Sequence, residues 1–205
     1  MSTPAARAAT PVQAVVFDLG GVLLRLADPL ELFELEQSES GFLALWLRSH
    51  SVREFERGGL DAQAFAEGLV RELGLPMTAR QFLERFRAWP QALFPGTRAL
   101  LESIPPGIRR VLLSNTNALH WDERPDVSGA LAGLFDRTFL SYRTGLLKPD
   151  REAFAQVVTS LACAPGEILF FDDNPGNVEA ALRLGWNAHR ARGPADVRRV
   201  LDKTL

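Results

Sequence analysis

The chain has 205 residues, of which 46% are hydrophobic and 23% are charged. This composition is typical of a globular protein and excludes a disordered, collagen-like or fibrous chain. At roughly 150 residues per domain, the length leaves room for one domain with an insertion. Lys and Arg number 23 against 25 for Asp and Glu, so the net charge of −2 offers no long-range field to nucleic acid or an anionic membrane.

The cellular setting is also expected from the sequence. The single cysteine, Cys163, has no partner for an intramolecular disulfide, which fits a reducing compartment. No apolar run approaches the ~20 residues of a membrane helix. Residues 1–12 are small and Pro-containing, with one Arg and no signal-peptide core, and are expected to form a flexible tail. We therefore expect a cytoplasmic protein without nucleic-acid or membrane partners, and the sequence makes no prediction of oligomeric state.

The first predicted strand covers residues 14–17, a short and mostly branched apolar run. The absence of alternation is typical of a strand that is covered on both faces. Asp18 follows at once, then Gly20 and Gly21. A carboxylate at the end of a buried strand is costly unless it is paired or meets a metal. A turn aspartate beside turn glycines is the alternative, and this motif alone does not decide between the two.

Residues 27–92 change to helical periodicity. Between Asp61 and Leu73, the apolar side chains fall on one helical face, with Asp61 as the predicted N-cap. Residues 79–89 form a second amphipathic pattern, and residues 31–37 and 42–48 supply two more helical segments. Since no strand is predicted between these segments, the region is interpreted as a helical cap inserted into another fold.

Alternating strands and helices resume after residue 93. Strands are predicted at 109–114, 137–141, 167–171 and 186–190, separated by helical patterns at 149–161 and 177–185 and followed by a last helix at 195–205. Strands separated by helices predict a parallel sheet with helices on both faces. The predicted fold class is therefore α/β, a Rossmann-like doubly wound core of residues 13–26 and 93–205 with a cap of residues 27–92.

Polar residues follow the predicted strands. Asp18 ends the first, Ser114 with Asn115 ends the second, Lys148 follows the third, and Asp172 with Asp173 ends the fourth. In a parallel sheet these ends meet at one edge, where ligands bind. An aspartate can attack phosphorus, an ammonium and a hydroxyl can hold phosphate oxygens, and paired carboxylates suit Mg²⁺. The pattern favours phosphoryl transfer.

Each residue also has a simpler interpretation. Ser114 fits a turn, Lys148 fits a solvated loop, and Asp172 with Asp173 fits the cap of a helix. Short motifs are individually unspecific. Their occurrence together, in order and at strand ends, favours the joint interpretation.

The motifs FDLGGVL, LLSN, GLLKPD and FFDDNPGNVEAA resemble those of the haloacid dehalogenase-like hydrolases, most of which are Mg²⁺-dependent phosphatases. LSNTN, FERG and FFDDN are more particularly similar to bacterial phosphatases acting on α-D-glucose 1-phosphate. The resemblance implies a phosphatase of a small phosphorylated metabolite, such as a sugar phosphate, with Mg²⁺ as cofactor and a cap that selects the substrate. It implies these roles for single residues: Asp18 as nucleophile and metal ligand, the Gly20 carbonyl and Asp173 as further metal ligands, and Ser114, Asn115 and Lys148 as phosphate ligands. Whether Asp172 also serves the metal stays open.

Gly20 departs from the general family pattern, because most phosphatases of this family have an aspartate there as general acid and base. The glucose 1-phosphate phosphatases that the chain resembles also have glycine at this place. General acid–base help is worth ~10²–10⁴-fold, so slow turnover or a substitute group is expected. His120 is a conceivable proton donor, although a plain helix-start histidine is the favoured interpretation.

Three functions stay open: a Mg²⁺-dependent phosphatase, which is favoured; a metal-independent 2-haloacid dehalogenase; and a catalytically weak phosphometabolite-binding protein. In the cap, Trp46, Trp89, Arg53 and Arg57 are candidate substrate contacts. Packing between cap helices is favoured for the tryptophans, and a charge-paired helix face for the arginines.

Overall fold

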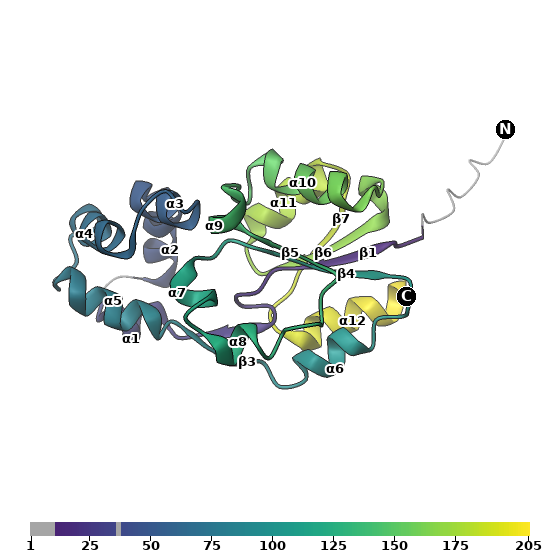
Figure 1. The fold of residues 1–205 in the computed structure, drawn as a ribbon, viewed down its shortest axis with the longest axis horizontal. Helices are drawn as coiled ribbons and strands as arrows, with labels where there is room; N and C mark the ends of the chain where they lie inside the picture. The colour runs from purple at the N-terminus through teal and green to yellow at the C-terminus, as the bar shows by residue number, and fades with distance from the viewer. Residues whose placement is uncertain (1–10, 36–37) are drawn as a thin grey trace.

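The centre of the molecule is a parallel sheet with the strand order β5-β4-β1-β6-β7 (Figure 1). The structure is a computed structural model and describes residues 11–35 and 38–205. The strands of this sheet are β1 (Ala14–Phe17), β4 (Arg109–Ser114), β5 (Arg137–Leu140), β6 (Ile168–Asp172) and β7 (Asn187–Arg190). All neighbouring pairs in the sheet are parallel, so their carboxyl ends lie at the same edge. The predicted strands and the doubly wound α/β fold are confirmed.

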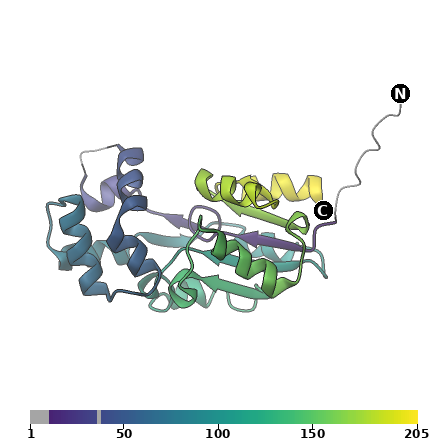
Figure 2. The ribbon, with the colours of Figure 1, turned by 90° about the horizontal axis from the view of Figure 1, so that it is seen from above.

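Alternate residues of β1 face opposite sides of the sheet. Val15 and Phe17 pack toward α6 (Thr97–Glu102) and α12 (Pro194–Thr204), whereas Ala14 and Val16 pack toward α10 (Arg151–Leu161) and α11 (Pro175–Arg183). The two helix layers lie on opposite sides of the sheet in Figure 1, and Figure 2 views the molecule from above, from the side of α10 and α11. Because β1 is buried on both faces, its sequence is a continuous apolar run.

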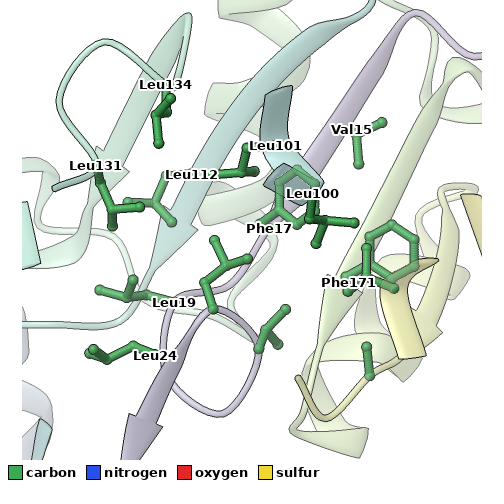
Figure 3. Packing of buried hydrophobic residues seen from close by; sticks show 14 of the residues in the cluster. Val15, Phe17, Leu19, Leu24, Leu100, Leu101, Leu112, Leu131, Leu134 and Phe171 are labelled. Atoms are coloured by element: carbon green, nitrogen blue, oxygen red, sulfur yellow. The ribbon is translucent and has the colours of Figure 1, made fainter. Parts of the chain in front are cut away.

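Figure 3 shows one of these two layers from close by. Phe17 stacks on Phe171 of β6 with their ring centroids 5.8 Å apart. Leu100 and Leu101 of α6 pack against the same cluster. This packing holds the ends of β1 and β6 side by side, which fixes the spacing of the aspartates that follow them.

Helices fill the stretch between β2 (Leu24–Leu26) and β3 (Pro90–Leu93) and lie beyond the carboxyl edge of the sheet (Figure 1). They are α1 (Pro29–Phe33), α2 (Glu39–Arg48), α3 (His50–Glu56), α4 (Ala62–Leu73) and α5 (Ala79–Arg87). We call residues 27–92 the helical unit. Asp61 caps α4 as predicted, accepting a hydrogen bond from the Ala64 N–H at 2.8 Å.

The helical unit has its own aromatic core. Phe33 stacks on Phe82 at 5.2 Å between ring centroids, and Trp46 meets Trp89 edge to face at 4.7 Å. Such pairs add roughly 0.5–1.5 kcal/mol each beyond the burial of their area. The first pair connects α1 to α5, and the second connects α2 to the segment before β3.

Two features of this region differ from the sequence-based expectation. β3 pairs with β2 in an antiparallel ladder, with Leu24 opposite Leu93, where no strand was predicted. A proline at the start of β3 hides the strand from sequence patterns, because proline is depleted in strands. Residues 53–57, interpreted as a charge-paired helix face, lie in and just after α3 (His50–Glu56), a helix that was not predicted as a separate element.

The remaining helical turns are short: α7 (Ala118–Trp121), α8 (Pro125–Ser128), α9 (Ser141–Thr144) and a 3₁₀ turn at Pro165–Glu167. Among the helices of the described residues, none combines the length and apolarity that crossing a membrane requires. Of the predicted tail at 1–12, residues 1–10 lie outside the described residues.

Candidate active site

The carboxyl edge of the sheet carries a buried ion-pair network. Lys148, which is only 3% exposed, donates from Nζ to Asp18 Oδ1 at 2.7 Å and to Asp172 Oδ2 at 2.6 Å. Asp18 follows β1, Asp172 ends β6, and Lys148 lies in the loop before α10. Residues separated by up to 154 positions thus meet because parallel strands end together.

Both carboxylate oxygens of Asp172 accept hydrogen bonds. The side-chain amide of Asn177 donates to both of its carboxylate oxygens, at 3.1 and 3.0 Å, and the Asn174 N–H donates to Oδ1 at 2.8 Å. Together with Lys148, these donors occupy a carboxylate that is fully buried. Asp172 is therefore fixed as a partner that orients the Lys148 ammonium.

Asp18 differs from Asp172 in having a free oxygen. Its Oδ1 accepts the Lys148 hydrogen bond, whereas Oδ2 accepts none from residues 11–35 and 38–205. Burial raises the pKa of Asp18 to about 7; Lys148 opposes this rise, and Asp172 and Asp173 add to it. For Lys148, burial alone would lower the pKa, but Asp172 and Asp18 outweigh it and raise the pKa above its usual value.

Asp18, Asp172 and Asp173 form an acidic cluster in which one carboxylate oxygen of each lies within 4.8 Å of the others. Burial first and the neighbouring Asp172 second raise the pKa of Asp173 to about 6, against the opposing effects of Lys148 and Arg192. Carboxylates outnumber the ammonium group here, and hard oxygen donors are the ligands that Mg²⁺ prefers. The donor set therefore fits a divalent cation, whose charge would relieve the repulsion.

Position 21 requires glycine for both backbone and steric reasons. Its φ is +72°, a region that favours glycine, and a Cβ at this position would lie 2.5 Å from Asp173 Oδ2. Asp173 can thus approach Asp18 only because residue 21 has no side chain. At Gly20, a Cβ would lie 3.3 Å from Leu26 Cδ1, so an apolar side chain borders the place where an acidic side chain would stand.

Ser114 and Asn115 have different surroundings. Among residues 11–35 and 38–205, the Ser114 hydroxyl has one hydrogen-bond contact, at 3.5 Å to the Asn115 carbonyl, and Ser114 lines the same cavity as Asp18. The Asn115 side chain instead grips the backbone of Lys148: its Nδ2 donates to the Lys148 carbonyl, and its Oδ1 accepts from the Lys148 N–H, both at 2.9 Å. Asn115 therefore holds the Lys148 loop against β4.

Arg53 and Arg57, candidates for substrate contacts, both pair with Asp150 of the core at 2.9 Å. Asp150 lies two residues after Lys148. The arginines thus connect α3 to the lysine loop. Trp46 and Trp89 pack in the aromatic core of the helical unit and also line the cavity.

Glu56 is a site residue that sequence reasoning missed. It ends α3 and lines the cavity with Asp18 and Lys148, and its carboxylate has no hydrogen bond or ion pair within the described chain. Burial raises the pKa of Glu56 to about 8, with Lys148 opposing the rise and Asp18 adding to it. The segment FERG contains Glu56, but only its arginine had been considered.

His120 is held as a neutral ring between core and helical unit. Nε2 lies 2.8 Å from the Phe86 carbonyl, Nδ1 lies 3.3 Å from the Asn117 amide, and the ring lies 4.1 Å from that of Phe86. Burial lowers the pKa of His120 to about 4. At neutral pH the ring has no proton to give without losing the Phe86 contact, so it is a poor proton donor.

Most of these groups line a cavity of about 570 Å³ between the sheet edge and the helical unit; Gly21, Arg53, Arg57 and Asp150 do not. Asp18, Gly20, Ser114, Lys148 and Asp173 line one end of it. Helices α2, α3 and α5 contribute the other end. The predicted site residues of the core therefore share one cavity.

A family model of the haloacid dehalogenase-like hydrolases matches residues 12–185. The chain belongs to this family. It is a hydrolase, in agreement with the resemblance of its motifs.

Relatives of this hydrolase include phosphatases. The sesquiterpene phosphatase astK of Aspergillus oryzae is 27% identical over 86% of this chain and 88% of its own. A haloacid dehalogenase-like hydrolase of Porphyromonas gingivalis is 27% identical, with a TM-score of 0.73 over 94% of this chain and 98% of its own. A family enzyme of Bacteroides thetaiotaomicron, solved with magnesium and inorganic phosphate, is 25% identical, with a TM-score of 0.67 over 87% of this chain and 93% of its own.

Proposed function

We propose that this hydrolase is a Mg²⁺-dependent phosphomonoesterase that acts on a small phosphorylated metabolite through an aspartyl-phosphate on Asp18. One observation carries the proposal. Asp18 has one oxygen held by Lys148 and one free oxygen, in a cavity that also contains Ser114 and Asp173. A nucleophile, a cation and a hydroxyl donor therefore converge where a phosphate group fits.

In the first step, the free oxygen of Asp18 attacks phosphorus. An O–P bond to Asp18 forms, the ester P–O bond breaks, and the leaving oxygen keeps the electron pair and takes a proton. Lys148 and the Ser114 hydroxyl hold phosphate oxygens as charge shifts during this step. Asn115, through its grip on the Lys148 backbone, positions the ammonium rather than holding phosphate with its side chain.

Asp18, Asp173 and the Gly20 carbonyl are the groups that would hold Mg²⁺. Asp172 is a weaker candidate, because its oxygens already accept hydrogen bonds from Lys148, Asn177 and the Asn174 backbone. When bound, Mg²⁺ supplies positive charge that offsets the repulsion between the phosphate and the aspartate nucleophile.

Glu56 is the group that we assign to proton transfer. Gly20 has no side chain to protonate the leaving oxygen, and His120 is neutral and occupied. The Glu56 carboxyl enters the cavity from α3 without a partner in the described chain, and its pKa of about 8 keeps it protonated at neutral pH. After the leaving group departs, the same carboxylate takes a proton from the water that cleaves the aspartyl-phosphate.

The helical unit acts as a cap in this proposal. It covers the cavity opposite the sheet edge, and Arg53 and Arg57 anchor it to Asp150. Excluding bulk water protects the aspartyl-phosphate until Glu56 directs a water molecule to it. The division into a core of 13–26 and 93–205 and a cap of 27–92 is part of the proposal.

The test measures phosphate release from sugar phosphates, including α-D-glucose 1-phosphate, nucleotides and p-nitrophenyl phosphate, with Mg²⁺ and with EDTA. We expect metal-dependent release of phosphate by the wild type and none by Asp18→Asn. Circular dichroism and the melting temperature serve to check that the variant is folded. Turnover retained by Asp18→Asn would overturn the aspartyl-phosphate mechanism.

The two other functions are separated by further arms of the test. Chloride release from 2-chloropropionate that EDTA does not reduce would indicate a dehalogenase, in which aspartate attacks carbon. Phosphate-ester binding in a thermal-shift assay, without release of phosphate from any substrate, would indicate a binding protein. The acidic cluster favours the phosphatase, since a dehalogenase has no need of a cation site.

A further inference from the structure

The two ends of the cavity differ in chemistry. The core contributes most of the polar groups, whereas the helical unit and β2 contribute large apolar side chains. The polar lining residues of the core are Asp18, Ser114, Asn115, Thr116, Asn117, His120, Lys148, Asp172, Asp173, Asn174, Asn177, Arg190 and Arg192. The apolar wall consists of Leu26, Leu43, Trp46, Leu47, Phe86 and Trp89. A phosphate group at the polar end would therefore place its organic group against hydrocarbon.

Helix α2 presents separate faces to the core of the helical unit and to the cavity. Phe42 is buried in the aromatic core, and Trp46 packs there and also borders the cavity. Leu43 and Leu47, one helical turn apart, line the cavity and stay 37% and 54% exposed. Large apolar side chains that gather at a cavity wall without being covered mark a ligand site.

Leu26 extends this wall to the reacting centre. It is 42% exposed, lines the cavity, and stands 3.3 Å from where a Cβ at Gly20 would be. Leu26 therefore borders the space that an aspartate side chain at position 20 would occupy. The first atoms of the organic group beyond the phosphate therefore meet an apolar surface.

Polar groups that could hold a sugar are scarce at the cap end. Apart from the tryptophans, the residues of the helical unit that line the cavity in the described chain include only Ser40 and Glu56 with polar side chains. Trp89 Nε1 already donates to the Ala27 carbonyl at 3.2 Å. A hexose would bring several hydroxyls that this end leaves without partners, at a cost for each.

We propose that the substrate is the phosphate monoester of an apolar alcohol, with its hydrocarbon group lying between α2 and Leu26. This inference rests on the proposed phosphatase function and names its substrate class. The cavity of about 570 Å³ falls in the range that holds drug-sized organic ligands. It is large enough for a hydrocarbon well beyond a few carbons.

The first experiment compares ethyl, butyl, hexyl and octyl phosphate below their micellar concentrations, with α-D-glucose 1-phosphate as reference. Burying one more methylene raises kcat/KM about two- to fourfold, so octyl phosphate should exceed ethyl phosphate by roughly 60-fold or more. We expect both octyl and hexyl phosphate to exceed the sugar phosphate. A flat series, or glucose 1-phosphate as the best substrate, would overturn the inference.

A matched pair of variants tests the wall itself. In Leu43→Ser/Leu47→Ser, the rise of kcat/KM with chain length should flatten. Leu45→Ser is the control, because Leu45 lies on the same helix and is 44% exposed but does not line the cavity. An unchanged slope in the double variant, or an equal loss of slope in the control, would contradict the assignment.

Binding separates failure of this inference from failure of the proposed function. The folded Asp18→Asn protein is heated with each alkyl phosphate and with inorganic phosphate. If the melting temperature of Asp18→Asn rises with chain length while the wild type releases no phosphate from any ester, the apolar site is retained and the phosphatase is rejected. Phosphatase activity without any dependence on chain length, in either binding or turnover, would do the reverse.

Discussion

The sheet edge and the helical unit build opposite halves of one cavity by different physical means. At the sheet edge, charged groups are buried and fixed by partners: Lys148 lies between Asp18 and Asp172, and Asn177 holds Asp172 in turn. In the helical unit, aromatic packing sets the shape and leaves leucines open to the cavity. Directional bonds fix reacting atoms to within fractions of an ångström, whereas apolar walls accept many shapes.

The largest effect is expected from removing the charge at the centre of the sheet edge. Lys148→Met leaves Asp18 and Asp172 buried without their cation, which costs about 3–5 kcal/mol of unfolding free energy. Phosphatase activity should fall by at least ~10³-fold. Urea denaturation in EDTA measures the stability, and Lys203→Met on α12 is the control. Equal free energies of unfolding for the two variants would show that Asp18 and Asp172 do not depend on the Lys148 cation for stability.

A second change moves one carboxylate without removing any charge. In Gly21→Ala, the new Cβ would meet Asp173 at 2.5 Å, so the carboxylate must move. Moving a catalytic group by about 1 Å costs roughly 10²-fold in kcat/KM. The moved carboxylate should also weaken stabilisation of the protein by Mg²⁺. Gly133→Ala is the matched control, because its φ of +74° carries a similar backbone cost and no atom lies within 4 Å of the added Cβ. Kinetics and thermal shifts with Mg²⁺ compare the two, and equal losses would assign the effect to the backbone alone.

The third change concerns the polar group that the helical unit brings to the sheet edge. Glu56→Gln should slow hydrolysis of alkyl phosphates on the order of 10²-fold and of p-nitrophenyl phosphate much less, because nitrophenolate leaves without a proton. A general acid acts when protonated, so wild-type kcat on alkyl phosphates should fall as pH rises through about 8. The variant should lack this limb. Glu54→Gln, on the same helix, is the control, and equal losses on both substrate types would indicate a structural role for Glu56.

The smallest effect is expected where the two halves touch at His120. Burial lowers the pKa of its ring to about 4, so the unfolded chain binds more protons between pH 4 and 6.5. The contribution of the neutral His120 to the free energy of unfolding is therefore fully present above pH 6.5. It is lost as the pH decreases, by about 1–2 kcal/mol at pH 5. Denaturation curves from pH 7.5 to 4.5 should be flatter for His120→Gln. His50→Gln, at an exposed position of α3, should follow the wild type; a wild-type slope in His120→Gln would place the pH dependence elsewhere.

The core could be predicted because each of its strands is recognisable from the sequence of that strand alone. A strand buried on both faces, such as β1, reads as an apolar run, and a polar residue marks its end. Parallel topology then brings Asp18, Ser114, Lys148 and Asp173 to one edge without any knowledge of side-chain positions. The positions of these four residues could thus be predicted from spacing and fold class.

The rest depends on how separate elements dock. Gly58 at the end of α3 has a φ of +78°, and a Cβ there would lie 2.5 Å from the Tyr142 carbonyl of α9. This contact sets the direction of α3, and with it the placement of Glu56, but no local pattern encodes it. The grip of Asn115 on the Lys148 backbone is equally non-local, since 33 residues separate the two. Pairing of β2 with β3 spans the whole helical unit and contains a proline.

Asp150 makes the loop of Lys148 common to both halves of the molecule. Its pairs with Arg53 and Arg57 are about one-third exposed, so dissolved salt weakens them, whereas the buried pairs of Lys148 are screened far less. Ionic strength thus acts selectively on the attachment of α3 and leaves the charged centre in place. As ionic strength rises, the attachment of α3 to the loop of Lys148 therefore weakens before the buried ion pairs of the sheet edge do.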